Sequence, residues 1–335
     1  ALVSLEPQTG FVRALVGGDD WEQSQVNLAL GRLGGGSGRQ AGSSFKPFVL
    51  AQALRAGIAP TRRYRAPASI QPKGFGKPVS NYGGSSYGTV DLRTATWKSI
   101  NTVYVQLILD AGINETAQLA RRLGITSIDP AEAEGGIALG TREVSPLDMA
   151  SAFGVFATGG LRSSPTPVVR ITSPDGERIE DNLRDRGKRV LEEPVADHVT
   201  ESLEGVLTKG TGTRAKIGRP AAGKTGTTDD NGNAWFVGYT PTLSTAVWMG
   251  HPEGNVPMRN IQGFRVVDGG TLPAKIWHDF MVEATANVPV ADFGDPGSLD
   301  SILDEARRDR SGGFKPGRKR SPTQLPPADP DAGEA

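Results

Sequence analysis

The chain has 335 residues, and its 37 Lys and Arg residues equal its 37 Asp and Glu residues, so the formal net charge is zero. This balance argues against nucleic acid as a partner, since phosphate binding normally shows as a basic excess. The sequence has no cysteine, which excludes disulfides and thiolate metal sites. Its three histidines (His198, His251 and His278) have no metal-ligand spacing, so we predict neither a metal nor a cofactor.

No apolar run approaches the ~20 residues that a membrane-spanning helix needs. The N-terminus lacks Met and the basic and apolar regions of a signal peptide, and it begins directly with the strand-like run Ala1 to Leu5. We therefore expect the chain to be part of a longer protein, with its location set by a preceding segment.

The first elements predicted along the chain are a hairpin and a helix. Residues 1–18 contain two apolar runs around Glu6 to Gly10, where Pro and Gly indicate a turn. The Gly-rich stretch Gly31 to Gly42 is too flexible to form a core element. A helix is predicted to begin near Ser43, because hydroxyls, an early proline and helix formers up to Leu54 follow one another there.

Residues 60–88 are rich in Pro, Gly, Ser and Tyr without a clear period, which predicts an irregular surface excursion. From about residue 89 to 165 the pattern is helical and indicates an all-helical lobe. Ser145 is typical of an N-cap, since Pro146 at the first helical position loses no hydrogen bond. Other helices of this lobe are predicted near Leu92, over 101–109 and over 115–123.

Strand signals return at Val168-Val169, and Gly223 to Gly250 contains three apolar segments that predict an antiparallel meander. Thr271 to Ala286 has the period of an amphipathic helix. Strands at both ends with helices between and after them indicate an α+β fold, with one antiparallel sheet covered by helices. We expect one domain over 1–290 and a Pro-rich C-terminal extension over 291–335, disordered from about residue 311.

Three short motifs carry the chemistry, and the first is Ser43-Ser44-Phe45-Lys46. On a helix, Ser43 and Lys46 share one face, so the amine can reach the serine hydroxyl. A serine is a weak nucleophile until a base takes its proton, and a lysine can act as that base if its pKa is lowered. The positive end of a helix N-terminus is one source of such lowering. By itself Ser-x-x-Lys is a weak signal that also occurs by chance.

The second motif, Ser99-Ile100-Asn101, lies between two predicted helices. There a hydroxyl could relay a proton and a carboxamide could hold a peptide bond, although Asn101 as a helix cap is the simpler interpretation. The third motif runs from Lys224 to Thr228, Lys-Thr-Gly-Thr-Thr. In a strand Lys224 and Gly226 face one way, and the missing side chain of Gly226 lets a ligand backbone approach. A polar edge strand protected by its lysine is the alternative.

Taken together, the three motifs are the signature of serine penicillin-recognising enzymes. The flanking sequence resembles the transpeptidase domain of class A (bifunctional) penicillin-binding proteins over about residues 1–285. The strings that carry this resemblance are RQAGSSFKPFVLAQAL (39–54), SINTVYVQL (99–107), ALGTREVSPLDMASAFGVFATGG (138–160) and AAGKTGTTDDNGNAWFVGYTP (221–241). The resemblance implies a five-stranded antiparallel sheet covered by helices, with an inserted helical lobe.

The resemblance also implies a role for each matching residue. Ser43 would be the acylated nucleophile, Lys46 its general base and Ser99 a proton relay. Asn101 would orient the substrate amide. The substrate would be held beside the strand by Lys224, Thr225, Gly226 and Thr227. The backbone N–H groups of Ser43 and Thr227 would form the oxyanion hole.

The implied function is a peptidoglycan D,D-transpeptidase that cross-links stem peptides ending in D-Ala-D-Ala, releases D-Ala and is acylated by β-lactams. It would work at the extracytoplasmic face of the bacterial plasma membrane. The glycosyltransferase domain and membrane anchor that precede this region in the family lie outside this sequence. Two small departures are Ala41 in place of proline and Asn233 in place of aspartate.

Two other interpretations stay open at this point. The same acyl-enzyme could pass to water, which gives a D,D-carboxypeptidase or a β-lactamase, although no convincing deacylating Glu-x-x-x-Asn occurs in the predicted lobe. A non-catalytic sensor that binds β-lactam or peptidoglycan is the other, and the three intact motifs count against it.

Overall fold

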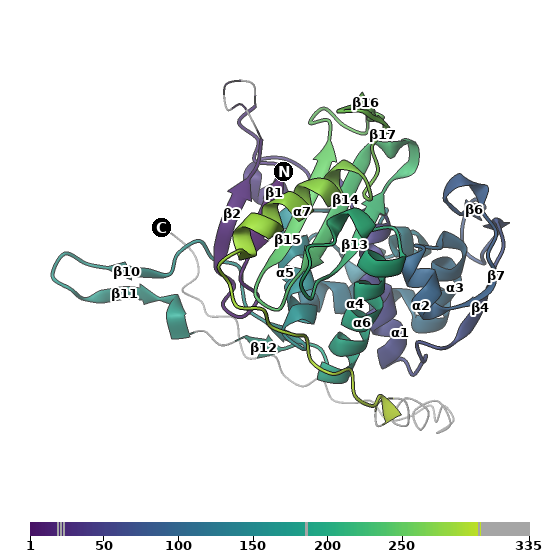
Figure 1. Cartoon of the computed structure of the whole chain (residues 1–335), viewed down its shortest axis with the longest axis horizontal. Helices are drawn as coiled ribbons and strands as arrows, with labels where there is room; N and C mark the ends of the chain where they lie inside the picture. The colour runs from purple at the N-terminus through teal and green to yellow at the C-terminus, as the bar shows by residue number, and fades with distance from the viewer. Residues whose placement is uncertain (19, 21, 23, 185–186, 301, 303–335) are drawn as a thin grey trace.

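A five-stranded antiparallel sheet forms the centre of the computed structural model, which describes residues 1–18, 20, 22, 24–184, 187–300 and 302 (Figure 1). Its strand order is β13-β14-β15-β1-β2, so segments from both ends of the chain lie side by side. This confirms the α+β class, the N-terminal hairpin and the later meander. The strands are β1 (Leu2–Leu5), β2 (Val12–Val16), β13 (Ala222–Thr227), β14 (Asn233–Tyr239) and β15 (Ser244–Gly250).

Side chains of β14 alternate between two layers of helices, as the period of a strand requires. The Phe236 ring packs against Trp277 of α7 (Leu272–Thr285), with 5.2 Å between ring centroids. Three residues later, Tyr239 packs on the other face against Phe153 of α5 (Pro146–Ala157). Both faces of the sheet are therefore covered at β14, which explains why every residue of this strand is buried.

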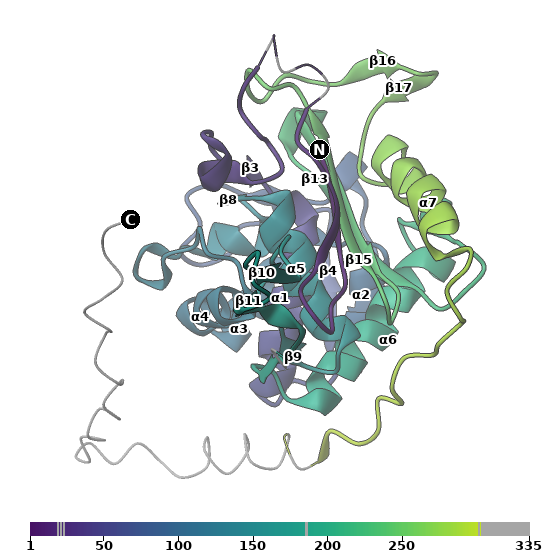
Figure 2. The ribbon, with the colours of Figure 1, turned by 90° about the vertical axis from the view of Figure 1, so that its left-hand side faces the viewer.

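Figure 2 shows α7 on one side of the sheet and α1 (Lys46–Arg55) and α5 on the other. The helix α6 (Glu193–Lys209) contacts β13 as well as α1 and α5. Helix α6 was not predicted, although Val195, Val199 and Leu203 repeat at the helical interval of four and are all buried. The predicted helix over 271–286 is confirmed as α7.

The helices expected between residues 89 and 165 are present. Asp91 caps α2 by accepting a hydrogen bond from the Thr94 amide, and Ser145 caps α5 in the same way through Asp148. Unlike the preceding helices, α5 packs directly against β1, β14 and β15. The extent of a separate helical lobe and the 1–290 domain boundary stay predictions. The helices before α5 are α2 (Leu92–Trp97), α3 (Asn101–Ala111) and α4 (Ile113–Leu123).

The excursion over residues 60–88 is more regular than predicted, because short strands pair within it and with the residues that follow. The pairs are β4 (Arg63–Ala66) with β7 (Gly88–Asp91) and β5 (Ser69–Ile70) with β6 (Val79–Ser80). The Gly-rich stretch also contains a strand, β3 (Arg39–Gln40), which pairs with β8 (Glu143–Val144). In both places backbone pairing across the fold supplies order that the local sequence does not indicate.

The strand expected at Val168-Val169 begins slightly later, at Arg170, in a hairpin that projects from the body in Figure 1. Within the described residues no helix is long and apolar enough to span a bilayer. The disorder predicted from about residue 311 lies outside the described residues. The remaining strands are β9 (Leu161–Arg162), β10 (Arg170–Thr172), β11 (Arg178–Asp181), β12 (Lys188–Arg189), β16 (Arg259–Ile261) and β17 (Phe264–Val266).

Replacing Trp277 tests the packing of α7 on the sheet. The side chain is fully buried, and its indole N–H lies 3.3 Å from the Gly238 carbonyl and 3.2 Å from that of Thr245. We expect Trp277→Ala to lower the free energy of unfolding by about 3–5 kcal/mol in urea titrations. The neighbouring Ile276 is 36% exposed, so Ile276→Ala should cost less than about 1 kcal/mol. Equal losses for the two variants would contradict this packing.

Candidate active site

Ser43 lies in a short 3₁₀ turn, Gly42–Phe45, directly before α1. The predicted α-helix therefore begins three residues late, at Lys46, whose amide donates to the Ser43 carbonyl. Residues three apart eclipse one another in a 3₁₀ turn, so Ser43 and Lys46 still share one side. Ser43 is half-buried, whereas Lys46 is fully buried.

The Lys46 amine is held by the second motif. It donates to the Ser99 carbonyl at 2.7 Å, to the Ser99 hydroxyl at 3.2 Å and to Asn101 Oδ1 at 2.7 Å. Among the hydrogen bonds of the described residues, none joins this amine to the Ser43 hydroxyl. Such bonds are often long without substrate and tighten in the complex.

The third motif converges on the same hydroxyl. The Lys224 amine donates to Ser99 Oγ at 2.8 Å and to the Thr225 carbonyl at 3.1 Å. Ser99 Oγ therefore lies between two lysine amines that are 178 residues apart in the sequence (224 − 46). The structure brings the three motifs together around one oxygen atom.

Burial lowers the pKa of both lysines, because a buried ammonium loses its hydration. The pKa of Lys46 falls well below its ordinary value, first through burial and second through the nearby charge of Lys224. Burial lowers the pKa of Lys224 to about 7. Sequence analysis expected a helix N-terminus to produce this lowering for Lys46, but burial is its largest cause. An amine with such a pKa can exchange a proton near neutral pH.

Ser99 has a backbone φ of 55°, in the left-handed region that non-glycine residues rarely adopt. This conformation turns the chain between α2 and α3 and places both the carbonyl and the hydroxyl of Ser99 on Lys46. Left-handed conformations cost about 1–3 kcal/mol and collect at functional sites. The Ser99 and Ile100 amides donate to the Thr96 and Ala95 carbonyls, so this conformation is the left-handed C-terminal turn that closes α2, where glycine is the usual residue.

Strand β13 is at the edge of the sheet. Lys224 faces Ser99, and the Thr225 hydroxyl lies 3.5 Å from the Lys224 amine and 2.6 Å from the hydroxyl of Thr211. The Thr227 hydroxyl accepts a hydrogen bond from the Gly269 amide and keeps its own proton free to donate. Sequence analysis did not identify Thr211, an exposed residue just after α6 that has no motif of its own.

Gly226 makes room for the protein itself rather than for a ligand. A Cβ at Gly226 would lie 2.4 Å from the Ala41 carbonyl oxygen and 3.0 Å from Ser44. The turn that carries Ser43 therefore presses directly on β13. Gly42 makes the reciprocal approach, because a Cβ there would lie 2.8 Å from the Thr227 nitrogen. Neither glycine can be replaced without moving the turn away from the strand.

The Thr227 N–H group points toward the open edge of β13. The Thr228 amide donates to the Asn233 carbonyl of β14, and successive amides of an antiparallel strand point in opposite directions. The Thr227 amide consequently faces away from β14, beside Gly42 and the Ser43 turn. The Thr227 amide is therefore not paired with β14.

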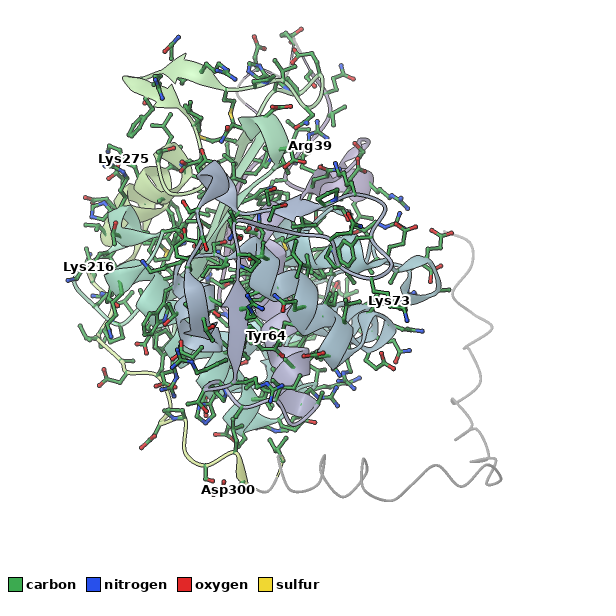
Figure 3. All side chains as sticks on the ribbon, turned by 90° about the vertical axis from the view of Figure 1, so that its right-hand side faces the viewer. Arg39, Tyr64, Lys73, Lys216, Lys275 and Asp300 are labelled. Atoms are coloured by element: carbon green, nitrogen blue, oxygen red, sulfur yellow. The ribbon has the colours of Figure 1, made fainter. Side chains whose placement is uncertain are left out.

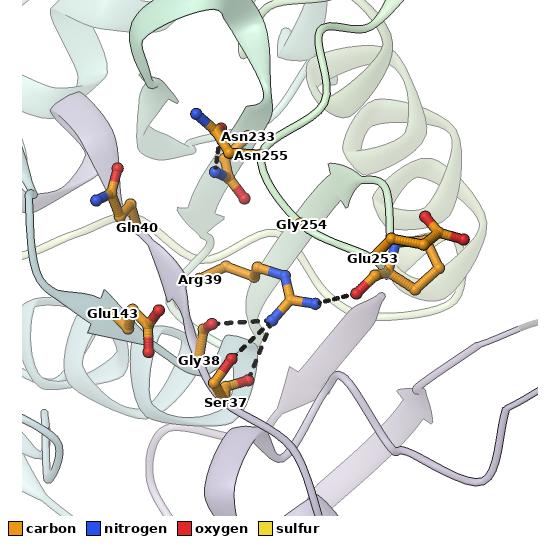
Figure 4. A pocket seen from close by; sticks show the side chains of 10 residues that line it. Ser37, Gly38, Arg39, Gln40, Glu143, Asn233, Glu253, Gly254 and Asn255 are labelled. Carbon is orange, nitrogen blue, oxygen red and sulfur yellow. Dashed lines mark hydrogen bonds between the residues drawn. The ribbon is translucent and has the colours of Figure 1, made fainter.

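A polar cavity of about 240 Å³ lies next to the strand that leads into the Ser43 turn (Figure 4). At its wall, Arg39 donates to the Pro252 carbonyl and stacks on Trp248 at 5.2 Å. Asn233 also lines this cavity, accepting from the Trp248 indole at 3.0 Å and donating to Asn255 Oδ1 at 3.0 Å. An aspartate, expected there from the resemblance, could not make the second bond.

Residues 1–253 match the family model described as the penicillin binding protein transpeptidase domain. The chain belongs to this family. This transpeptidase domain is similar to penicillin-binding protein 1A of Aquifex aeolicus, with 36% identity over 88% of the chain and 39% of the relative. With penicillin-binding protein 1A of Neisseria meningitidis it shares 37% identity over 84% of the chain and 35% of the relative. The chain thus spans under two-fifths of these relatives.

Solved structures agree with the family assignment. The penicillin-binding protein PonA1 of Mycobacterium tuberculosis superposes with a TM-score of 0.78 at 32% identity, over 89% of this chain and 80% of that one. A second structure of PonA1, in complex with penicillin V, gives the same values. The fold of this transpeptidase domain is therefore that of the penicillin-binding transpeptidases.

Burial of Lys224 predicts a pH dependence of stability. Its pKa is about 7 in the folded protein and 10.5 when unfolded, so between these values the unfolded chain binds more protons. Stability then rises with pH, by up to about 1.4 kcal/mol per pH unit. In urea titrations from pH 7.5 to 9, the parent should gain stability relative to Lys224→Met, which carries no titrating group. A difference that is flat or falls with pH would show that Lys224 is not buried as described.

The strained backbone of Ser99 predicts an unusual order of stability. Ser99→Ala and Ser99→Gly both lose the hydroxyl, but only glycine accepts a φ of 55° without strain. We expect the free energy of unfolding of Ser99→Gly to be about 1 kcal/mol higher than that of Ser99→Ala, the reverse of the order at ordinary positions. Thermal unfolding of the two variants side by side measures this, and a more stable alanine variant would refute the strained conformation.

Proposed function

We propose that this chain is a peptidoglycan D,D-transpeptidase domain that works through an acyl-enzyme on Ser43. The single observation that supports it best is the position of Ser99 Oγ between the buried amines of Lys46 and Lys224. Buried amines of lowered pKa suit proton transfer near neutral pH, which a purely binding site does not need.

In the first step, the Ser43 oxygen attacks the carbonyl carbon of the penultimate D-Ala in a stem peptide ending in D-Ala-D-Ala. Neutral Lys46 takes the hydroxyl proton, and the backbone N–H groups of Ser43 and Thr227 hold the resulting oxyanion. When the C–N bond breaks, Ser99 delivers its proton to the nitrogen of the departing D-Ala and takes up the proton held by Lys46, whose amine lies 3.2 Å from Ser99 Oγ. Removing one oxyanion donor typically costs about 100- to 1000-fold in rate.

Substrate is oriented by the remaining residues of the site. Lys224 and the hydroxyls of Thr225 and Thr227 bind the terminal carboxylate, and the free Thr227 proton suits this role. Asn101 orients the substrate amide. Gly226 contributes by letting the Ser43 turn lie against the strand where the peptide docks.

In the second step, an amine of a neighbouring stem peptide attacks the ester carbonyl. The Ser43 oxygen leaves and regains a proton, and the new amide bond is the cross-link. A β-lactam enters the first step as a mimic of D-Ala-D-Ala and leaves Ser43 acylated. We place this reaction at the extracytoplasmic face of the bacterial plasma membrane. There the chain would be joined to a glycosyltransferase domain and an anchor outside the present sequence.

Intact mass after incubation with benzylpenicillin tests the acyl-enzyme. The parent should gain the mass of one penicillin, and Ser43→Ala should gain none. The neighbouring Ser44 is a matched control, because its buried hydroxyl donates to the Ala41 carbonyl and takes no part in the proposed chemistry. Ser44→Ala should therefore still be acylated. An adduct on Ser43→Ala would refute the proposal.

The fate of the acyl-enzyme separates the alternatives. D-Ala release with cross-linked product supports transpeptidation, whereas D-Ala release with hydrolysed peptide alone indicates a D,D-carboxypeptidase. Many turnovers of nitrocefin per protein would indicate a β-lactamase. A stable adduct without D-Ala release would favour a sensor.

A further inference from the structure

Residues 60–91, here called the strap, comprise the excursion and the rest of β7, and they contact α3 through β4 and β6. Figure 3 views this side and labels Tyr64 and Lys73 within the strap. The Tyr64 hydroxyl donates to Asp110 of α3 at 2.7 Å, and Gln106 of α3 donates to the Arg65 carbonyl at 2.9 Å. The strap is thus tied along the helix that begins with Asn101.

Asn81 is the residue through which the strap reaches the N-terminus of α3. It is only 5% exposed, and each polar atom of its side chain has a partner. Its Oδ1 accepts from the Thr102 amide at 3.0 Å. Its Nδ2 donates to the Pro67 carbonyl at 2.9 Å and to the Ser85 carbonyl at 2.8 Å. Asn81 therefore connects two points of the strap that lie before and after it in the sequence.

Helix α3 lacks a cap of its own. Its N-cap residue, Ile100, has no side-chain hydrogen bond to offer, so the first amides of the helix need another acceptor. Asn81 supplies that acceptor from 21 residues earlier in the chain. Ser99, just before this end of α3, closes α2, because the Ser99 and Ile100 amides donate to the Thr96 and Ala95 carbonyls at 3.1 and 2.9 Å. The chain between the two helices is therefore fixed by the C-terminal turn of α2 on one side and by Asn81 on the other.

The residue before Asn81 determines how Asn101 is turned. The Ser80 carbonyl accepts a hydrogen bond from Asn101 Nδ2 at 2.9 Å, so the amide must present Oδ1 on its other side. That oxygen accepts from the Lys46 amine at 2.7 Å. If the strap moved away, the amide could turn and set its NH₂ group against the lysine, donor against donor.

We propose that Asn81 is a positioning residue for acylation of Ser43. By capping α3 from the strap, it fixes the start of α3 beside Lys46 and keeps the Asn101 amide oxygen on Lys46. This inference rests on the proposed function, and it assigns to Asn81 the geometry of the proton-transfer groups rather than a contact with substrate.

The test separates the acylation rate constant from the dissociation constant for a fluorescent penicillin, by stopped-flow at several drug concentrations. We expect Asn81→Ala to lower the rate constant by about 10- to 100-fold and to change the dissociation constant far less. Partial unfolding would instead lower the acylated fraction at the end point and leave the rate constant of the folded protein unchanged.

Two further variants make the result specific. Asn81→Asp keeps an acceptor for the Thr102 amide but cannot donate to the Pro67 and Ser85 carbonyls, so it loosens the strap while retaining the cap. Asn81→Asp should also slow acylation, and it provides the test if Asn81→Ala does not fold. Ser69→Ala is the matched control, since the exposed Ser69 hydroxyl bonds only within the strap, to Val79 and Ser80. Its rate constant should stay within about twofold of the parent.

The inference would be overturned if folded Asn81→Ala or Asn81→Asp had a rate constant within about twofold of the parent. The proposed function would still stand in that case, because the parent is acylated. An equal loss in Ser69→Ala would also overturn it, because the effect would then belong to the strap in general. A parent that takes up no penicillin would refute the proposed function and this inference with it.

Discussion

The burial of two lysine amines around one serine hydroxyl is the interaction on which the rest of the site depends. Lys46 and Lys224 are both fully buried, and both donate to Ser99 Oγ. Burying an ammonium is costly unless its hydrogen bonds are met, and the protein meets them with neutral oxygens rather than carboxylates. That choice matters, because a carboxylate partner would raise the pKa of each amine, whereas neutral acceptors leave the lowering by burial intact.

Close backbone contacts make this arrangement possible. Gly42 and Gly226 let the Ser43 turn press against β13, so that Ser43 lies close to the edge strand. In our proposal the strap positions the start of α3 and Asn101 in a similar way, through Asn81 and the Ser80 carbonyl. The site is therefore assembled from the Ser43 turn, strand β13 and the start of α3, each of which is in contact with a neighbouring segment.

The sheet accounts for the rigidity of the site. Because α7 covers one face and α5 the other, β14 is fully buried and holds β13 at the edge with its outer amides free. An edge strand with unpaired N–H groups is normally a liability for aggregation, but under the proposed function these groups would serve as backbone donors to an extended peptide.

Sequence alone determined the class of fold, the main strands and most helices, because these follow from local periodicity and turn residues. It also identified Ser43, Lys46, Ser99 and the Lys-Thr-Gly strand as members of one site, since their residue types have few other uses in that combination. Only the tertiary structure decided which oxygen the two amines share, that burial lowers their pKa, and that Gly226 accommodates the protein's own turn. The strap and Asn81 were invisible for the same physical reason: their order comes from pairing and capping across the fold, and no local pattern records partners that lie 20 or more residues away.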